Sequence, residues 1–304
     1  MDYEYVLETN NLCKSYNGVQ VVKDVNMHIK QGDIYGFIGE NGAGKTTIMR
    51  MISGLTYPTS GSYKIFGVSE KDKNIYNVKR EMGGIVELVS LTKNMTALDN
   101  LKMQAIIVNV KKSNEELIEL IQKVGLVYEE IKNKKVGNFS LGMKQRLGIA
   151  MTLISSPKFI LLDEPMNGLD PQGFVEMRET ILNLNKEGVT FLISSHILSE
   201  LEKIVNHVGF ISHGRLLEEI SMDDLHKKAR KRISITPIDL NKTLEILKTL
   251  NIKDMNVENN VIEIFDELNI NDLIKTFVNN NCEIDKISMI EDTIEDYYIK
   301  LLRG

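Results

Sequence analysis

The chain has 304 residues, which is long enough for one large domain and a smaller one. Hydrophobic residues make up 42% and charged residues 26%, a composition that is ordinary for a globular protein and excludes a wholly disordered or fibrous chain. The formal net charge of -5 provides no general attraction to nucleic acid or to an anionic membrane surface. Nucleic acid is therefore not an expected partner.

Cysteine usage and hydropathy indicate the cellular setting. Cys13 and Cys282 have no second cysteine or histidine at metal-ligand spacing, which favours a reducing, cytoplasmic environment. The first residues, Met1 to Glu4, lack the basic and apolar regions of a secretory signal. No segment approaches the ~20 apolar residues of a membrane-spanning helix. We expect any membrane role to come through a partner.

Short apolar runs recur along the chain, with helical patterns between them. They lie at 34–38, 62–66, 159–162, 191–194 and 208–212. This alternation predicts an α/β core. After the first run, a helix is expected with Ile48, Met51, Ile52 and Leu55 on one buried face, because these residues follow a spacing of three and four.

Strand patterns are missing between positions 90 and 157, and an all-helical insertion is expected there. Ser113 and Glu116 form a capping-box pattern before the apolar series Leu117, Leu120, Ile121 and Val124. A second helix is predicted after Ser140, with Leu147, Ala150, Met151 and Ile154 inward. It should stop before Pro157, because the residue that precedes a proline disfavours helix.

A basic run, from Lys227 to Arg232, separates this core from the rest of the chain. Its simplest interpretation is a solvated helix end rather than a contact with lipid headgroups. The following residues are patterned as strand, helix, hairpin, helix, strand and helix. We therefore predict a large α/β domain over 1–220, with its helical subdomain at about 90–157, and a small accessory α/β domain over 221–304.

A phosphate-binding pattern, G-x-x-x-x-G-K-[ST], runs from Gly39 to Thr46 between the predicted strand and the predicted helix. Its glycines allow backbone N–H groups to turn towards an anion, and the helix N-terminus adds positive potential. Lys45 is expected to reach the β and γ phosphates, and Thr46 to bind Mg²⁺. The nucleotide-binding residues predicted here are Gly39, Asn41, Gly42, Gly44, Lys45, Thr46 and Thr47.

Two carboxylates, Asp163 and Glu164, follow the apolar run at 159–162. Taken alone, such a pair is usually a polar strand end. Beside a phosphate loop, Asp163 lies where open α/β sheets bind ligands and suits Mg²⁺. Glu164 suits a base that accepts the proton of the water attacking the γ-phosphate. These motifs predict nucleotide hydrolysis, with ATP and Mg²⁺ as the expected ligands.

Further residues resemble those of ABC ATPases. The segment from Asn138 to Arg146 is similar to their signature loop, with Ser140 and Gly142 kept. Asn167 to Asp170 stands where the family has its D-loop, His196 where it has its switch histidine, and Tyr16 where it has an aromatic under the adenine. Singly, each has a simpler interpretation, as a helix cap, a strand end or a surface aromatic. The resemblance covers positions 5–220 and implies a P-loop NTPase fold of the ABC type.

The resemblance also implies how such a chain works. Two copies pair head to tail, and each ATP is held by the phosphate loop of one copy and by Ser140 and Gly142 of the other. Hydrolysis lets the copies part, and a separate permease in the membrane, which contacts the cargo, uses this motion. A cytoplasmic location at the inner face of the membrane follows.

Over its full length the sequence resembles the ATPases of bacitracin-resistance and lantibiotic-immunity exporters, including the stretches 32–37 and 295–301. Two residues depart from the general ABC pattern. Leu141 replaces the usual signature glycine, and Glu87 stands where most ABC ATPases have glutamine. Glu87 could bind the metal and assist catalysis, couple the nucleotide site to the permease, or simply replace glutamine.

Other functions remain open from the sequence. The same motor could export another cargo, such as a drug or a lipid. A soluble, non-transport ABC ATPase would be expected to have two cassettes in tandem or a long coiled-coil insertion, and this chain has neither. A regulator that does not hydrolyse ATP would be expected to lack the base, whereas Glu164 is present.

Overall fold

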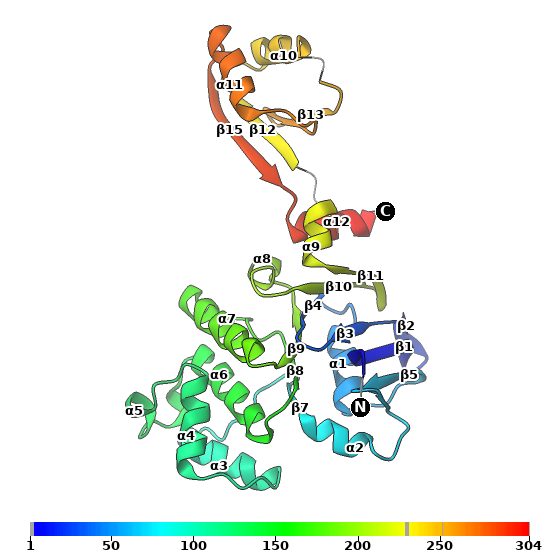
Figure 1. Cartoon of the computed structure of the whole chain (residues 1–304), viewed down its shortest axis with the longest axis vertical. Coiled ribbons are helices and arrows are strands. Elements are labelled where there is room, and N and C mark those ends of the chain that lie inside the picture. The colour runs from blue at the N-terminus through cyan, green and yellow to red at the C-terminus, as the bar shows by residue number, and fades with distance from the viewer. Residues whose placement is uncertain (1–2, 229–230, 251, 304) are drawn as a thin grey trace. The chain divides into compact units, whose positions relative to one another are not determined.

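The computed structural model describes residues 3–228, 231–250 and 252–303 (Figure 1). The chain divides into two compact units, Met1–Asp223 and Asp224–Gly304, whereas we expected the division after residue 220. Residues 229 and 230 of the basic run lie outside the described residues. No helix within the described ranges combines the length and apolar character needed to cross a bilayer.

A six-stranded sheet forms the centre of the first unit. Five of its strands are parallel, and only β11 is antiparallel to its neighbour. In sheet order, the strands are β11 (Arg215–Ser221), β10 (His207–Ser212), β4 (Ile34–Ile38), β9 (Thr190–Ser195), β8 (Phe159–Asp163) and β7 (Met82–Ile85). Every residue of β4, β8 and β9 is buried, as expected for parallel strands covered on both faces.

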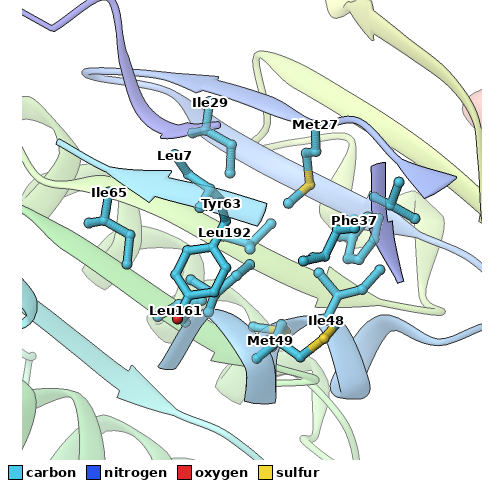
Figure 2. Packing of buried hydrophobic residues seen from close by; sticks show 14 of the residues in the cluster. Leu7, Met27, Ile29, Phe37, Ile48, Met49, Tyr63, Ile65, Leu161 and Leu192 are labelled. Carbon is cyan, nitrogen blue, oxygen red and sulfur yellow. The ribbon is translucent and has the colours of Figure 1, made fainter. Parts of the chain in front are cut away.

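A second, antiparallel sheet lies beside the first. It contains β2 (Val19–Val25), β1 (Tyr5–Tyr16), β5 (Ser60–Ile65) and β6 (Val68–Ser69), and β3 (His28–Lys30) pairs with β1. Helix α1 (Lys45–Ser53) shares one core with both sheets, as Figure 2 shows. The residues labelled there are Leu7, Met27, Ile29, Phe37, Ile48, Met49, Tyr63, Ile65, Leu161 and Leu192.

The prediction for Leu55 was wrong. Helix α1 ends at Ser53, because Gly54 adopts the left-handed conformation, with φ of 88°, that closes many helices. Leu55 follows this cap and is 64% exposed. Ile48, Met51 and Ile52 are buried as expected.

All elements between β7 and β8 are helical, and the structure describes every residue of this region. They are α3 (Ala97–Ile107), α4 (Asn114–Lys123), α5 (Tyr128–Ile131), α6 (Leu141–Thr152) and the 3₁₀ turns Val136–Asn138 and Leu153–Ser155. The capping box of Ser113 and Glu116 opens α4, and the helix after Ser140 stops before Pro157, which confirms both predictions. Figure 1 shows these helices and α1 on opposite sides of β7 to β9.

Further helices complete the first unit. Helix α2 (Ile75–Val78) and a 3₁₀ turn (Lys79–Glu81) precede β7, α7 (Pro171–Lys186) connects β8 to β9, and α8 (Leu198–Leu201) follows β9. Asp170 caps α7, since its side chain accepts a hydrogen bond from the N–H of Gly173. Helix α9 (Met222–Lys228) crosses the division between the units.

The second unit contains strands and helices in the predicted order. They are β12 (Lys231–Pro237), α10 (Leu240–Lys248), β13 (Met255–Glu258), β14 (Val261–Ile264), α11 (Ile270–Asn279), β15 (Ile284–Glu291) and α12 (Ile294–Arg303). The strands form an antiparallel sheet in the order β13-β14-β12-β15, which is the arrangement of a split βαβ, or ferredoxin-like, fold. Ile233, Ile235, Leu273 and Phe277 belong to its separate hydrophobic core.

Candidate functional site

The loop between β4 and α1 has the backbone of an anion-binding site. A Cβ atom at Gly39 would lie 2.5 Å from the carbonyl oxygen of Ile211, so the chain can pass there only as glycine. Gly42 and Gly44 have φ values of 82° and 108°, which glycine adopts without strain. Asn41, which precedes Gly42 in the loop, is exposed. Such turns allow successive N–H groups to converge on a phosphate.

Lys45 is the first residue of α1 and is only 5% exposed. Its Nζ donates hydrogen bonds to the carbonyl oxygens of Gly39, at 2.5 Å, and Glu40, at 3.3 Å. The ammonium is thus folded back over the loop that should hold the phosphates. Thr46 and Thr47 follow in the first turn of the helix and are half-buried.

Thr46 and Asp163 meet although they lie far apart in the sequence. The Thr46 hydroxyl donates to Asp163 Oδ2 at 2.8 Å, and Asp163 is the last residue of β8. A hydroxyl and a carboxylate side by side are hard oxygen ligands of the kind that Mg²⁺ prefers. These two residues therefore fit the predicted metal site.

Ser194 is a further residue of this site that sequence reasoning passed over. Its hydroxyl donates to Asp163 Oδ1 at 2.5 Å and accepts a hydrogen bond from the Glu164 backbone N–H at 2.9 Å. Asp163 and Ser194 are register partners on the parallel strands β8 and β9. A serine at the end of the strand next to the acidic pair was the available signal.

Glu164 lies between two side chains from other elements. Its Oε2 is 2.7 Å from Nδ1 of His196, and its Oε1 is 3.6 Å from Nζ of Lys45. The residue has a φ of 50°, and its backbone N–H is held by Ser194. The structure thus brings together Lys45, Thr46, Asp163, Glu164 and His196, five of the predicted residues.

Glu87 lies outside this cluster. Its Oε1 is 3.0 Å from Nη1 of Arg50 on α1, and its side chain is 54% exposed. Within the described ranges its carboxylate makes no hydrogen bond or ion pair with Lys45, Thr46 or Asp163. The residue follows β7 and has a φ of 72°, which is strained for a residue with a Cβ. The structure therefore gives Glu87 a cationic partner rather than a place beside Thr46 and Asp163.

Ser140 and Gly142 belong to the helical part. Ser140 is exposed and caps α6, where its hydroxyl accepts the N–H of Met143 at 3.2 Å. Gly142 faces Leu169, since a Cβ at Gly142 would lie 3.6 Å from its Cδ2. No hydrogen bond or ion pair of the described residues joins Ser140 or Gly142 to Lys45 or Glu164. Within one copy of the chain, the segment of Ser140 and Gly142 therefore does not join the cluster around Lys45 and Glu164.

Tyr16 ends β1 and is 43% exposed. Lys14 Nζ lies 4.9 Å from the centroid of its ring. The hairpin of β1 and β2 touches the phosphate loop, because a Cβ at Gly44 would lie 3.1 Å from the carbonyl oxygen of Val21. An exposed ring at this edge is available for stacking on a flat base.

A groove with a cavity volume of about 410 Å³ lies in the first unit where the end of α1, strand β7 and helices α3 and α6 meet. Leu55 lines it beside the end of α1, Val108 lies at the end of α3, and Met151 belongs to α6. Leu88, which is 83% exposed, lines it immediately after Glu87. The groove thus touches the helix of the phosphate loop, the Glu87 segment and the helix that follows Ser140.

Comparison with known proteins agrees with this geometry. The ABC transporter family model matches residues 22–167. The bacitracin transport ATP-binding protein BcrA of Bacillus licheniformis is 46% identical over 98% of both chains. The lantibiotic transport ATP-binding protein SrtF of Streptococcus pyogenes is 45% identical over 72% of this chain and 92% of its own.

Solved structures agree as well. An ATP-binding subunit of an ABC transporter matches 73% of this chain and 92% of its own, with a TM-score of 0.64 and 28% identity. A nucleotide-free ATP-binding cassette shares the fold, with a TM-score of 0.66 at 22% identity over 73% of this chain and 94% of its own. The predicted fold class and family are confirmed. The chain belongs to the ATP-binding subunits of ABC transporters, and it is an ATPase.

Proposed function

We propose that this ATPase powers an exporter that protects the cell from antimicrobial peptides of the bacitracin or lantibiotic type. The observation that carries the proposal is the 46% identity to a bacitracin transport ATP-binding protein, which extends over 98% of the chain and so includes the second unit. The 45% identity to a lantibiotic transport protein supports the same class of cargo. The membrane subunit, rather than this chain, would contact the peptide.

The contacts of Lys45 and Glu164 suggest how this chain hydrolyses ATP. Lys45 and the N–H groups of its loop bind the β and γ phosphates. A water lies against the Glu164 carboxylate, which accepts its proton as the water oxygen bonds to the γ phosphorus and the bond to the β–γ bridging oxygen breaks. His196, 2.7 Å from Glu164, keeps the carboxylate oriented. ADP and phosphate are the products.

Thr46 and Asp163 would hold Mg²⁺, directly or through water, in this proposal. The ion would neutralise phosphate charge and so strengthen binding of the triphosphate. Their contact of 2.8 Å, at the edge of the sheet beside the phosphate loop, supports this assignment. Tyr16 would stack on the adenine from the exposed end of β1.

Ser140 and Gly142 would complete the site of a second copy. Ser140 is exposed and Gly142 is half-buried at the start of α6, apart from Lys45 and Glu164. This placement supports a head-to-tail homodimer with ATP at the interface. The positive end of α6 would then face the phosphates of the opposite subunit. ATP would hold the two copies together, and its hydrolysis would release them.

The groove beside β7 would receive the permease. Leu55 and Leu88 both line it and expose 64% and 83% of their surfaces, and exposed apolar side chains gathered in one groove are typical of a surface that binds a partner. Glu87 lies between two groove residues, Val86 and Leu88, and is bound to Arg50 on α1. We assign Glu87 a role in coupling ATP hydrolysis to the permease. Its neighbours line the groove that would receive the permease, while its carboxylate contacts Arg50 on α1, the helix that follows the phosphate loop. The chain would then lie at the cytoplasmic face of the membrane.

A resistance assay tests the proposal. The gene is deleted, and the strain is complemented with the wild-type chain, with Glu164→Gln or with Glu179→Gln, an exposed carboxylate on α7. We expect deletion and Glu164→Gln to lower the inhibitory concentration of bacitracin or of a lantibiotic, and Glu179→Gln to restore it. Unchanged tolerance of both peptide classes in the deletion strain would contradict this cargo and favour a drug or a lipid.

A further inference from the structure

Lys79 places a positive charge in the wall of the groove. It belongs to the 3₁₀ turn before β7, is half-buried, and lines the cavity together with Leu55 and Leu88. A Cβ at Gly54 would lie 2.8 Å from Lys79 Nζ, so the ammonium lies against the cap of α1. The negative end of the α1 dipole therefore offers it some compensation.

Among the described residues, this ammonium donates one hydrogen bond, and its acceptor is a neutral group. Lys79 Nζ donates to the Tyr63 hydroxyl at 2.9 Å and lies 5.3 Å from the centroid of that ring. Burial raises the pKa of Tyr63 to about 12, so the phenol stays protonated at neutral pH and provides no counter-charge. Among the described residues, no carboxylate oxygen lies within salt-bridge distance of Lys79 Nζ.

Partial burial already disfavours the charged form of Lys79. Desolvation lowers the pKa of its ammonium, and the charge of Glu70 opposes this effect without a direct contact. Any partner that covers Leu55 and Leu88 would remove more water from the ammonium. Closing an apolar surface over an unpaired charge is unfavourable, whereas supplying an opposite charge makes the same contact favourable and specific.

We propose that the groove binds a cytoplasmic segment of the membrane partner whose aspartate or glutamate pairs with Lys79 while its apolar side chains cover Leu55 and Leu88. This inference rests on the proposed function, because it assumes a membrane partner. It adds the chemistry of the contact and names Lys79 as a residue that determines which partner is accepted. The carboxylate would lie next to the C-terminal end of the helix that begins with Lys45.

The first test identifies the residue that faces Lys79. The affinity-tagged chain is purified with its membrane partner from detergent-solubilised membranes and treated with a water-soluble carbodiimide, which joins a lysine amine to a carboxylate in contact with it. Mass spectrometry should find the Lys79 peptide joined to an aspartate or glutamate of the membrane protein. If Lys79 is joined to no partner residue while other lysines of the chain are, the proposal is wrong.

Variants provide the second test. We expect Lys79→Glu to lower the amount of co-purified membrane protein about tenfold or more, and Lys79→Arg to keep it within about twofold. Lys73→Glu, an exposed lysine of the preceding loop, is the matched charge reversal and should have no effect. Thermal unfolding of each isolated variant checks that it folds.

Exchanging the two charges distinguishes the loss of a specific ion pair from general damage to the groove by the Lys79→Glu substitution. Replacing the cross-linked carboxylate of the partner by lysine should restore co-purification with Lys79→Glu. Full recovery of the partner by Lys79→Glu alone, or no rescue by the exchange, would overturn the inference. If the wild-type chain recovers no integral membrane protein, the proposed function itself fails, which is a different result.

Discussion

The carboxylate of Glu164 and the imidazole of His196 lie 2.7 Å apart at the edge of the central sheet. Glu164 follows β8 and His196 follows β9, and these strands are parallel neighbours. Because parallel strands end on the same side of a sheet, residues 32 positions apart reach each other there. On the other side, Glu164 is 3.6 Å from the Lys45 ammonium. The proposed base is therefore positioned by both the sheet and the phosphate loop.

His196→Ala should lower the kcat for ATP about 10- to 100-fold, because the Glu164 carboxylate loses the side chain that orients it. The KM for ATP should stay within a few-fold, since His196 has no contact with Lys45 or Thr46 in the described structure. Steady-state phosphate release measures both constants. His226→Ala, at an exposed position on α9, is the control. A normal kcat in His196→Ala would show that His196 does not assist hydrolysis.

Lys45→Ala should weaken ATP binding about 10- to 100-fold, because one charge-assisted hydrogen bond to phosphate contributes ~1.5 to 3 kcal/mol. Isothermal titration calorimetry with ATP measures the affinity. Lys186→Ala, at the exposed end of α7, removes a lysine elsewhere and should bind normally. Near-normal affinity in Lys45→Ala would refute the assignment of the phosphate site.

Gly142→Ala tests whether Gly142 is needed for the ATP-dependent dimer rather than for the stability of a single copy. An added Cβ would meet nothing closer than 3.6 Å in the chain itself, and alanine favours a helix over glycine by roughly 0.5 to 1 kcal/mol. We therefore expect an unchanged or slightly higher melting temperature but a weaker ATP-dependent dimer, since the methyl group would add bulk beside Ser140, where the nucleotide of the other copy is proposed to bind. Light scattering with ATP measures the dimer. Normal dimerisation would mean that Gly142 does not contact the opposite nucleotide.

Glu87→Ala should leave the basal ATPase activity of the isolated subunit within a few-fold of normal and reduce peptide resistance in cells that carry the whole transporter. The exposed pair with Arg50 contributes no more than about 1 kcal/mol to stability, so the fold should survive. Glu87→Gln should have a milder effect in both assays. A loss of hydrolysis as complete as that in Glu164→Gln would place Glu87 in the catalytic set instead.

Glu87→Gly distinguishes the effect of losing the Glu87 carboxylate from the effect of the backbone conformation at this position. Glycine adopts the φ of 72° without strain, so this variant should be at least as stable as Glu87→Ala while lacking the same carboxylate. Equal loss of resistance in both variants would assign the effect to the ion pair with Arg50. Normal resistance in Glu87→Gly would show that the side chain is dispensable.

The proximity of Lys45, Asp163 and Glu164 was predictable from the sequence because these residues lie in motifs with a fixed position at strand ends. Lys45, Asp163 and Glu164 each follow an apolar run, and parallel strands bring such ends to one edge. The order of elements in the second unit was also predictable, since strand and helix have different hydrophobic periods.

Other features depend on local backbone conformation or on contacts between distant segments. Leu55 fits the helical period, but Gly54 ends the helix one residue before it. Glu87 reaches Arg50 from a left-handed backbone conformation, which no sequence pattern indicates. The groove and the placement of Lys79 arise where three parts of the first unit meet, so they are properties of the tertiary structure.

Phosphate release by the purified Glu164→Gln variant tests the central claim most directly. The amide cannot accept the proton of the attacking water, and a positioned general base contributes typically 10²- to 10⁴-fold, so kcat should fall by at least about 100-fold. ATP should still bind and should hold the variant as a dimer in light scattering. Wild-type turnover in Glu164→Gln, or a variant that stays monomeric with ATP, would contradict the account.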